Sequence, residues 1–106
     1  MSDGFVTVAK AGQIPVGAAQ VVRVGDQSLA VFHLADGYHV LDDVCTHDGG
    51  PLAEGVLDGD VIECPRHGAR FDVRTGAAIQ LPAFEPVETH EVRLEGDTVQ
   101  VGVEHQ

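Results

Sequence analysis

The sequence has no tryptophan, and only 5% of its residues are aromatic. Hydrophobic residues nevertheless make up 43% of the 106 residues, which argues against a disordered chain. A chain of this length is enough for one domain that buries roughly two thirds of its unfolded surface. Residues 1–106 are therefore expected to form a single domain whose core is mostly valine, leucine, isoleucine and alanine.

Long apolar stretches are also missing. No run approaches the roughly 20 apolar residues that a membrane-spanning helix needs. The first four residues, Met-Ser-Asp-Gly, do not form a basic region followed by an apolar one, so no signal peptide is expected. The expected location is the cytoplasm, without membrane attachment.

Basic residues are scarce, with 6 lysines and arginines against 17 aspartates and glutamates, for a formal charge of −11. Nucleic-acid binding is not expected, because phosphate contacts need a basic surface. An anionic membrane surface would repel the chain as well. The acidity either keeps the protein in solution or steers it toward a basic partner surface.

Short segments of alternating polarity, separated by glycine and aspartate turns, fill the chain. No stretch keeps a helical period over the ten or so residues of a typical helix. The pattern predicts an all-β fold, a sandwich or a barrel, with a final hairpin around Gly96-Asp97. The expected strands are residues 5–8, 19–24, 29–34, 38–41, 56–57, 61–63, 70–73, 77–79, 89–95 and 98–103.

Residues 42–86 are richer in glycine, proline and charge than the segments on either side. This difference predicts a small subdomain inserted into an antiparallel β base. Within it, residues 81–86 contain two prolines and are not expected to form a central strand, because proline cannot donate to the hydrogen-bond ladder.

The only two cysteines each have a histidine close by. Cys45 precedes His47 by two positions, Cys64 precedes His67 by three, and 16 residues separate the two pairs. In a cytoplasmic protein this arrangement favours a metal site over a disulfide. Thiolate and imidazole suit either zinc or an iron–sulfur centre. Zinc fingers usually pair cysteine with cysteine and histidine with histidine, whereas each pair here is mixed.

The segments Cys45-Thr46-His47 and Cys64-Pro65-x-His67-Gly68 resemble the two-loop motif of Rieske [2Fe–2S] proteins. The chain is most similar to the small ferredoxins of that family that serve bacterial oxygenase systems. The resemblance implies a Rieske fold, with an antiparallel β-sandwich or barrel base and a cluster-binding subdomain near residues 42–86. It also implies that Cys45 and Cys64 bind the inner iron and that His47 and His67 bind the outer iron, which takes the electron. Residues 81–83 resemble the family's proline loop.

Four positions depart from the high-potential members of that family. Gly50 and Arg66 stand where those proteins carry a disulfide, and Ala69 and Phe71 stand where they carry serine and tyrosine hydroxyls. Neither the Ala69 side chain nor the Phe71 side chain can donate a hydrogen bond to a reduced cluster. The expected reduction potential is therefore near the low end of the Rieske range, about −150 mV.

By this resemblance the protein is a soluble one-electron carrier without catalytic activity of its own. It would pass electrons from a flavin-dependent ferredoxin reductase to a terminal oxygenase that hydroxylates an aromatic ring. Two alternatives remain open: the small Rieske subunit of an assimilatory nitrite reductase, and a zinc-stabilised interaction module.

The remaining histidines lack a partner at ligand spacing and are expected on strands or at the surface. They are His33, His39, His90 and His105. Arg66 and Asp48 each adjoin an expected ligand, so both are expected on the docking face.

Overall fold

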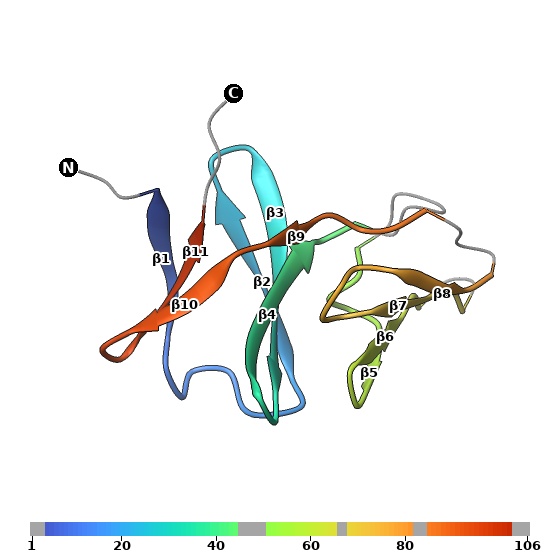
Figure 1. Ribbon diagram of the computed structural model, residues 1–106, viewed down its shortest axis with the longest axis horizontal. Helices are drawn as coiled ribbons and strands as arrows, with labels where there is room; N and C mark the ends of the chain where they lie inside the picture. The colour runs from blue at the N-terminus through green and yellow to red at the C-terminus, as the bar shows by residue number, and fades with distance from the viewer. Residues whose placement is uncertain (1–3, 45–50, 66–67, 82–84, 103–106) are drawn as a thin grey trace.

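The computed structural model describes residues 4–44, 51–65, 68–81 and 85–102. Within these ranges the chain forms strands and turns but no helix, and the paired strands run antiparallel (Figure 1). The prediction of an all-β fold is confirmed. No part of the described chain has the helical length and apolarity of a membrane span.

The strands form three sheets that stand side by side in Figure 1. The first sheet, in the order β1-β11-β10, comprises β1 (Phe5–Lys10), β11 (Thr98–Gly102) and β10 (Val92–Glu95). The central sheet, in the order β2-β3-β4-β9, comprises β2 (Ala19–Val24), β3 (Gln27–Leu34), β4 (Gly37–Asp42) and β9 (Thr89–His90). The third sheet comprises β5 (Val56–Asp58), β6 (Val61–Glu63), β7 (Arg70–Asp72) and β8 (Ala78–Gln80), in that order.

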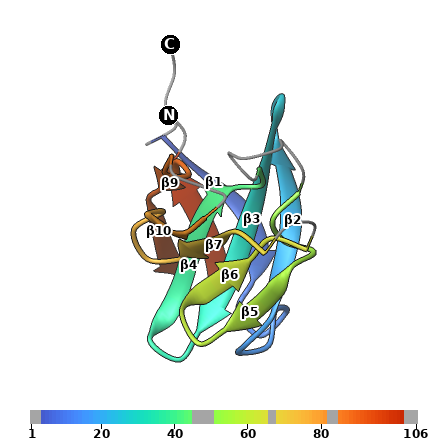
Figure 2. The same ribbon diagram turned by 90° about the vertical axis from the view of Figure 1, so that its right-hand side faces the viewer.

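The central sheet is covered on both faces. Along β3, Leu29 and Val31 belong to the core shared with the first sheet, whereas Ala30 and Phe32 belong to the core shared with the third. Successive strand residues point to opposite faces, so a strand between two layers reads as a continuous apolar run. Figure 2 shows the third sheet lying across one face of the central strands.

The third sheet is built from three short hairpin connections. Leu57, Ile62, Phe71 and Ala78 pair across it and carry its inward-facing side chains, with Ile62 and Phe71 fully buried. The expected strands 56–57 and 61–63 form a hairpin around Gly59, and the expected strands 70–73 and 77–79 form one around Thr75-Gly76, each with slightly different bounds. The sheet therefore presents one apolar face to the base and leaves its ends free to carry loops.

The predicted strand over residues 89–95 is wrong in one respect. The segment is interrupted at Glu91: β9 pairs with β4 in the central sheet, and β10 pairs with β11 in the first sheet. The Glu91 carbonyl accepts a hydrogen bond from the Gly102 N–H at 2.8 Å. The chain therefore passes from one layer to the next at this residue. The predicted hairpin around Gly96-Asp97 is confirmed as β10–β11.

Candidate metal centre

One of the four expected ligands, Cys64, lies within the described residues. Cys45, His47 and His67 lie outside them, as do Asp48, Gly50 and Arg66. The structure nevertheless describes the residues from which both ligand-bearing segments begin and end. These flanking residues define the framework of the site. They are residues 43–44 and 51–53 for the first segment, and residues 64–65 and 68–69 for the second.

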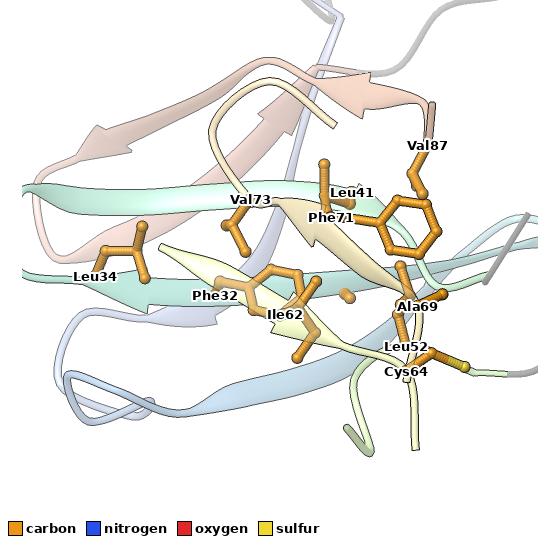
Figure 3. Close-up of a cluster of buried hydrophobic side chains, with 11 residues drawn as sticks. Phe32, Leu34, Leu41, Leu52, Ile62, Cys64, Ala69, Phe71, Val73 and Val87 are labelled. Atoms are coloured by element: carbon orange, nitrogen blue, oxygen red, sulfur yellow. The ribbon is translucent and has the colours of Figure 1, made fainter. Parts of the chain in front are cut away.

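Cys64 follows β6 directly and is 1% exposed. Its side chain belongs to the core between the central and third sheets, where Figure 3 shows it beside Leu52 and Ala69. The thiol therefore lies at one end of an apolar core, away from Leu34 at the other end. A buried soft sulfur donor in apolar surroundings, next to polar loops, fits an iron–sulfur ligand.

The second ligand-bearing segment is the connection between β6 and β7. The Cys64 N–H donates to the Ala69 carbonyl at 2.7 Å, and the Gly68 N–H donates to the Cys64 carbonyl at 3.3 Å. Gly68 has φ +77°, a conformation that residues with a Cβ rarely adopt. The two hydrogen bonds hold Cys64 at the neck of a tight loop that contains His67.

The first ligand-bearing segment joins the end of β4 to the turn before β5. The Asp43 N–H donates to the Ser28 carbonyl at 3.0 Å, which extends the contact of the chain with β3 beyond the end of β4. The Asp43 carboxylate accepts hydrogen bonds from the N–H groups of Leu52 and Ala53. Sequence reasoning assigned no role to this contact, because its two partners lie nine and ten positions further along the chain.

Gln80, at the end of β8, also contacts the segment between β6 and β7. Its side-chain amide donates to the Gly68 carbonyl at 3.1 Å. The next residue, Leu81, is 72% exposed, and residues 82–84 of the expected proline loop lie outside the described residues. Beyond that loop, the Val87 N–H donates to the Gly76 carbonyl at 2.8 Å. This hydrogen bond brings the chain back to the third sheet.

The side chains of Ala69 and Phe71 are fully buried in the same core as Cys64. Neither can donate a hydrogen bond. The surroundings of the Cys64 sulfur in the described residues are therefore apolar: Leu52, Ala69 and Phe71 are all members of this core. The side chains at positions 69 and 71 therefore lie in the same core as the Cys64 thiol and bring no hydroxyl group to it.

The other described histidines have partners within the β base. His33 contacts the Ile14 carbonyl through Nδ1 at 2.6 Å and stacks on Tyr38. His39 pairs with Asp36 at 3.1 Å, and His90 pairs with Asp42 at 2.7 Å. The prediction that these histidines lie on strands or at the surface is confirmed for these three, which lie on strands, and His105 lies outside the described residues.

The two described arginines of this region pair with carboxylates. Arg70 contacts Glu63 at 3.2 Å and Asp58 at 3.6 Å on the outer face of the third sheet. Arg74 contacts Asp60 at 3.1 Å and Asp36 at 3.2 Å, and so joins the β5–β6 turn to the β3–β4 turn of the central sheet. These pairs are partly exposed, so each contributes modestly to stability.

Comparison with known proteins agrees with this framework. The family model described as "Rieske [2Fe-2S] domain" matches residues 4–91. Ferredoxin CarAc of Metapseudomonas resinovorans is 39% identical over 105 residues, covering 98% of each chain. The ferredoxin component of the naphthalene 1,2-dioxygenase system of Pseudomonas aeruginosa is 33% identical over 101 residues, covering 95% of this chain and 97% of that one.

Solved structures agree as well. A chain in the complex of reduced oxygenase and oxidized ferredoxin of carbazole 1,9a-dioxygenase superposes with a TM-score of 0.91 at 38% identity, covering 99% of this chain and 98% of that one. The Rieske fold predicted from the sequence is confirmed. A nitrite reductase small subunit from Mycobacterium tuberculosis superposes with a TM-score of 0.85 at 19% identity, covering 96% of each chain, and shares the fold alone. The matching family model and the full-length relatives agree with the buried position of Cys64 at the start of its loop. This chain therefore belongs to the Rieske [2Fe-2S] domain family.

Proposed function

We propose that this protein is a one-electron carrier that holds a Rieske [2Fe–2S] cluster and delivers electrons to a terminal oxygenase acting on an aromatic ring. The observation that carries the proposal is the full-length similarity to ferredoxin components of dioxygenase systems, at 32–39% identity. Those relatives are electron-transfer components and not catalytic oxygenases. The nitrite reductase reading is disfavoured, because two solved structures described as nitrite reductase small subunits share only 16% and 19% identity with this chain.

The proposed ligand set is Cys45 and Cys64 on one iron and His47 and His67 on the other. Its support is the position of Cys64, whose backbone closes the loop that contains His67. Further support is the chemistry of the four side chains, since two thiolates and two imidazoles are the donors of a Rieske centre. Bound in this way, the cluster takes up and releases one electron.

The contribution of the protein is to fix and shield this centre. The apolar core around Cys64 excludes water from the sulfur, and the hydrogen bonds at both loop necks fix the backbone that carries the ligands. Without hydroxyl donors at positions 69 and 71, the extra negative charge of the reduced state receives less stabilisation. We therefore propose a potential near the low end of the Rieske range, about −150 mV.

The proposed partners are a terminal oxygenase downstream and a flavin-dependent ferredoxin reductase upstream. The oxygenase is supported by the similarity to the ferredoxin seen in complex with the carbazole dioxygenase oxygenase. The reductase is supported by the need for an electron donor in such a chain. We place the protein in the cytoplasm, where its two cysteines would serve as metal ligands and not as a disulfide.

The test combines spectroscopy with reconstitution. The purified protein is expected to be red-brown and to give a paramagnetic resonance signal on reduction, whereas a zinc protein would be colourless and silent. Cys64→Ser should lose the cluster, because metal binding and loop folding are coupled. The reduced protein should then transfer its electron to an aromatic-ring oxygenase in a stopped-flow experiment. Stable copurification with a large sirohaem subunit would instead favour the nitrite reductase reading.

A further inference from the structure

Asp43 contacts both ends of the first ligand-bearing segment. Its backbone N–H donates to the Ser28 carbonyl at 3.0 Å, which fixes the end of β4 against β3. Its side-chain Oδ1 accepts from the Leu52 N–H and from the Ala53 N–H, each at 2.8 Å. One residue therefore ties the start of the segment to the base and to the residues that follow its end.

The partners of this carboxylate are themselves fixed. The side chain of Leu52 is fully buried in the core that contains Cys64 and Ala69. The Leu52 carbonyl accepts from the Gly55 N–H at 2.9 Å and begins the turn that leads to β5. The Asp43 contact therefore connects the first segment to the same core that holds the Cys64 thiol.

The neighbouring carboxylate has a different partner. Asp42 pairs with His90 at 2.7 Å across the β4–β9 contact and takes no part in closing the segment. Two adjacent aspartates thus carry the same formal charge at nearly the same place in the chain. Among the described residues, the Asp43 carboxylate binds backbone N–H groups beyond the segment, whereas the Asp42 carboxylate binds the His90 side chain. Asp42 therefore serves as a control for charge.

We propose that Asp43 is a positioning residue for the iron–sulfur centre, which acts by holding together the two ends of the segment that contains Cys45 and His47. The inference rests on the proposed ligand set. Its basis is geometric: a single acceptor oxygen must lie 2.8 Å from two successive N–H groups. Asparagine offers the same oxygen without the charge, and glutamate keeps the charge but moves the oxygen by one methylene group.

The experiment compares Asp43→Asn, Asp43→Glu and Asp43→Ala with the native protein and with Asp42→Asn. The first measurement is the rate of cluster loss to a chelator, followed by the visible absorption of the oxidised protein. Asp43→Ala and Asp43→Glu are expected to lose the cluster on the order of tenfold faster, because the two hydrogen bonds to the Leu52 and Ala53 N–H groups are removed or misplaced. Asp43→Asn and Asp42→Asn should stay within about threefold of the native rate.

The second measurement is the paramagnetic resonance spectrum of the reduced protein, which a purely structural role would leave unchanged. Asp43→Ala and Asp43→Glu are expected to broaden or shift the g values, and Asp43→Asn should restore the native spectrum. Thermal unfolding followed by circular dichroism separates a general loss of stability from a local effect at the cluster.

Three results would overturn the inference. The first is a native-like Asp43→Glu together with a failing Asp43→Asn, which would assign the effect to charge. The second is a native rate and spectrum in all three Asp43 variants. The third is an Asp42→Asn variant that is as damaging as Asp43→Ala. A failure of the proposed function looks different, because the native protein itself would then carry no iron–sulfur cluster.

Discussion

At the scale of single residues, the described side chains around Cys64, a proposed ligand, are apolar. Ala69 and Phe71 fill the core beside the thiol without offering a donor. The Ala69 carbonyl, meanwhile, accepts a hydrogen bond from the Cys64 N–H at 2.7 Å. The backbone of Ala69 therefore closes the loop. A substitution of its side chain leaves that hydrogen bond in place and changes only the surroundings of the proposed centre.

Ala69→Ser introduces a hydroxyl at this position and is expected to raise the reduction potential. The potential reports how much stronger the new hydrogen bond is in the reduced than in the oxidised state. A hydrogen bond to a charged group is typically worth about 1.5–3 kcal/mol, so for one electron the shift is at most roughly 60–130 mV. Protein-film voltammetry provides the measurement. Ala30→Ser, at another fully buried alanine of the same core, is the control and should leave the potential nearly unchanged. An equal shift in both variants would attribute the effect to core polarity in general.

The sequence suggests the four proposed ligands because each cysteine has its histidine within three positions, and three of the four lie outside the described residues. The contact of Asp43 with Leu52 and Ala53 could not be identified in this way. Its partners are backbone groups, which carry no residue-specific signal, and the intervening chain must fold before they meet. Local patterns therefore suggest candidate ligands, but they do not reveal the backbone contacts that hold the neighbouring chain in place.

At the scale of secondary-structure elements, the β7–β8 hairpin depends on a close backbone approach. A Cβ at Gly76 would lie 2.1 Å from the carbonyl oxygen of Val87. Val87 follows the expected proline loop in the chain. Gly76 also has φ +79° and donates its own N–H to the Asp72 carbonyl at 2.7 Å. Glycine is required here for space as well as for conformation.

Gly76→Ala is expected to lower the free energy of unfolding by more than about 2 kcal/mol, because backbone strain and a steric clash add together. Gly25→Ala is the matched control: this glycine also has positive φ, at +60°, but no atom lies within 4 Å of its added Cβ. The control should cost only about 1–2 kcal/mol. Chemical denaturation of the cluster-loaded protein measures both, and equal losses would show that conformation alone matters at Gly76.

The hairpins of the third sheet could be predicted because each is a local turn between two apolar segments. The interruption at Glu91 could not, since no glycine or proline marks a break within residues 89–95. His90 pairs with Val40 and Val92 pairs with Val101, and the choice between these partners is made by distant strands. Tertiary pairing therefore overrides the local pattern at this point.

At the scale of the whole molecule, Arg74 links two layers through the carboxylates of Asp36 and Asp60. The hydrogen bond from His39, and after it the hydrogen bond and charge of Arg74, hold the pKa of Asp36 below its usual value. A carboxylate with a lowered pKa stabilises the folded state above its unfolded pKa of about 3.9 and loses this contribution as pH falls through the folded value.

Arg74→Gln is therefore expected to raise the pKa of Asp36 toward its ordinary value, as measured by carboxyl-carbon nuclear magnetic resonance in an acid titration. The variant should also be less stable than the native protein near neutral pH, and the difference should shrink as the pH falls below about 4. An unchanged Asp36 titration would show that His39 alone sets the shift.

The net charge of −11 predicts that electron transfer to the oxygenase slows as salt is added. Long-range attraction to a basic partner surface is screened over about 10 Å at 0.1 M ionic strength. Stopped-flow rates between about 0.02 and 0.5 M salt measure the effect, and a neutral small-molecule reductant, whose rate should not change, is the control. A partner rate that is indifferent to salt would leave the acidity with no role beyond solubility.

The central sheet belongs to two separate cores, one on each of its faces. Cooperative units of a protein often follow such divisions. Removal of iron should therefore release the amides of β5–β8 to exchange with deuterium, while those of β3 and β11 remain protected. The cofactor layer would then be able to open, receive its metal and close again on a scaffold that stays folded throughout.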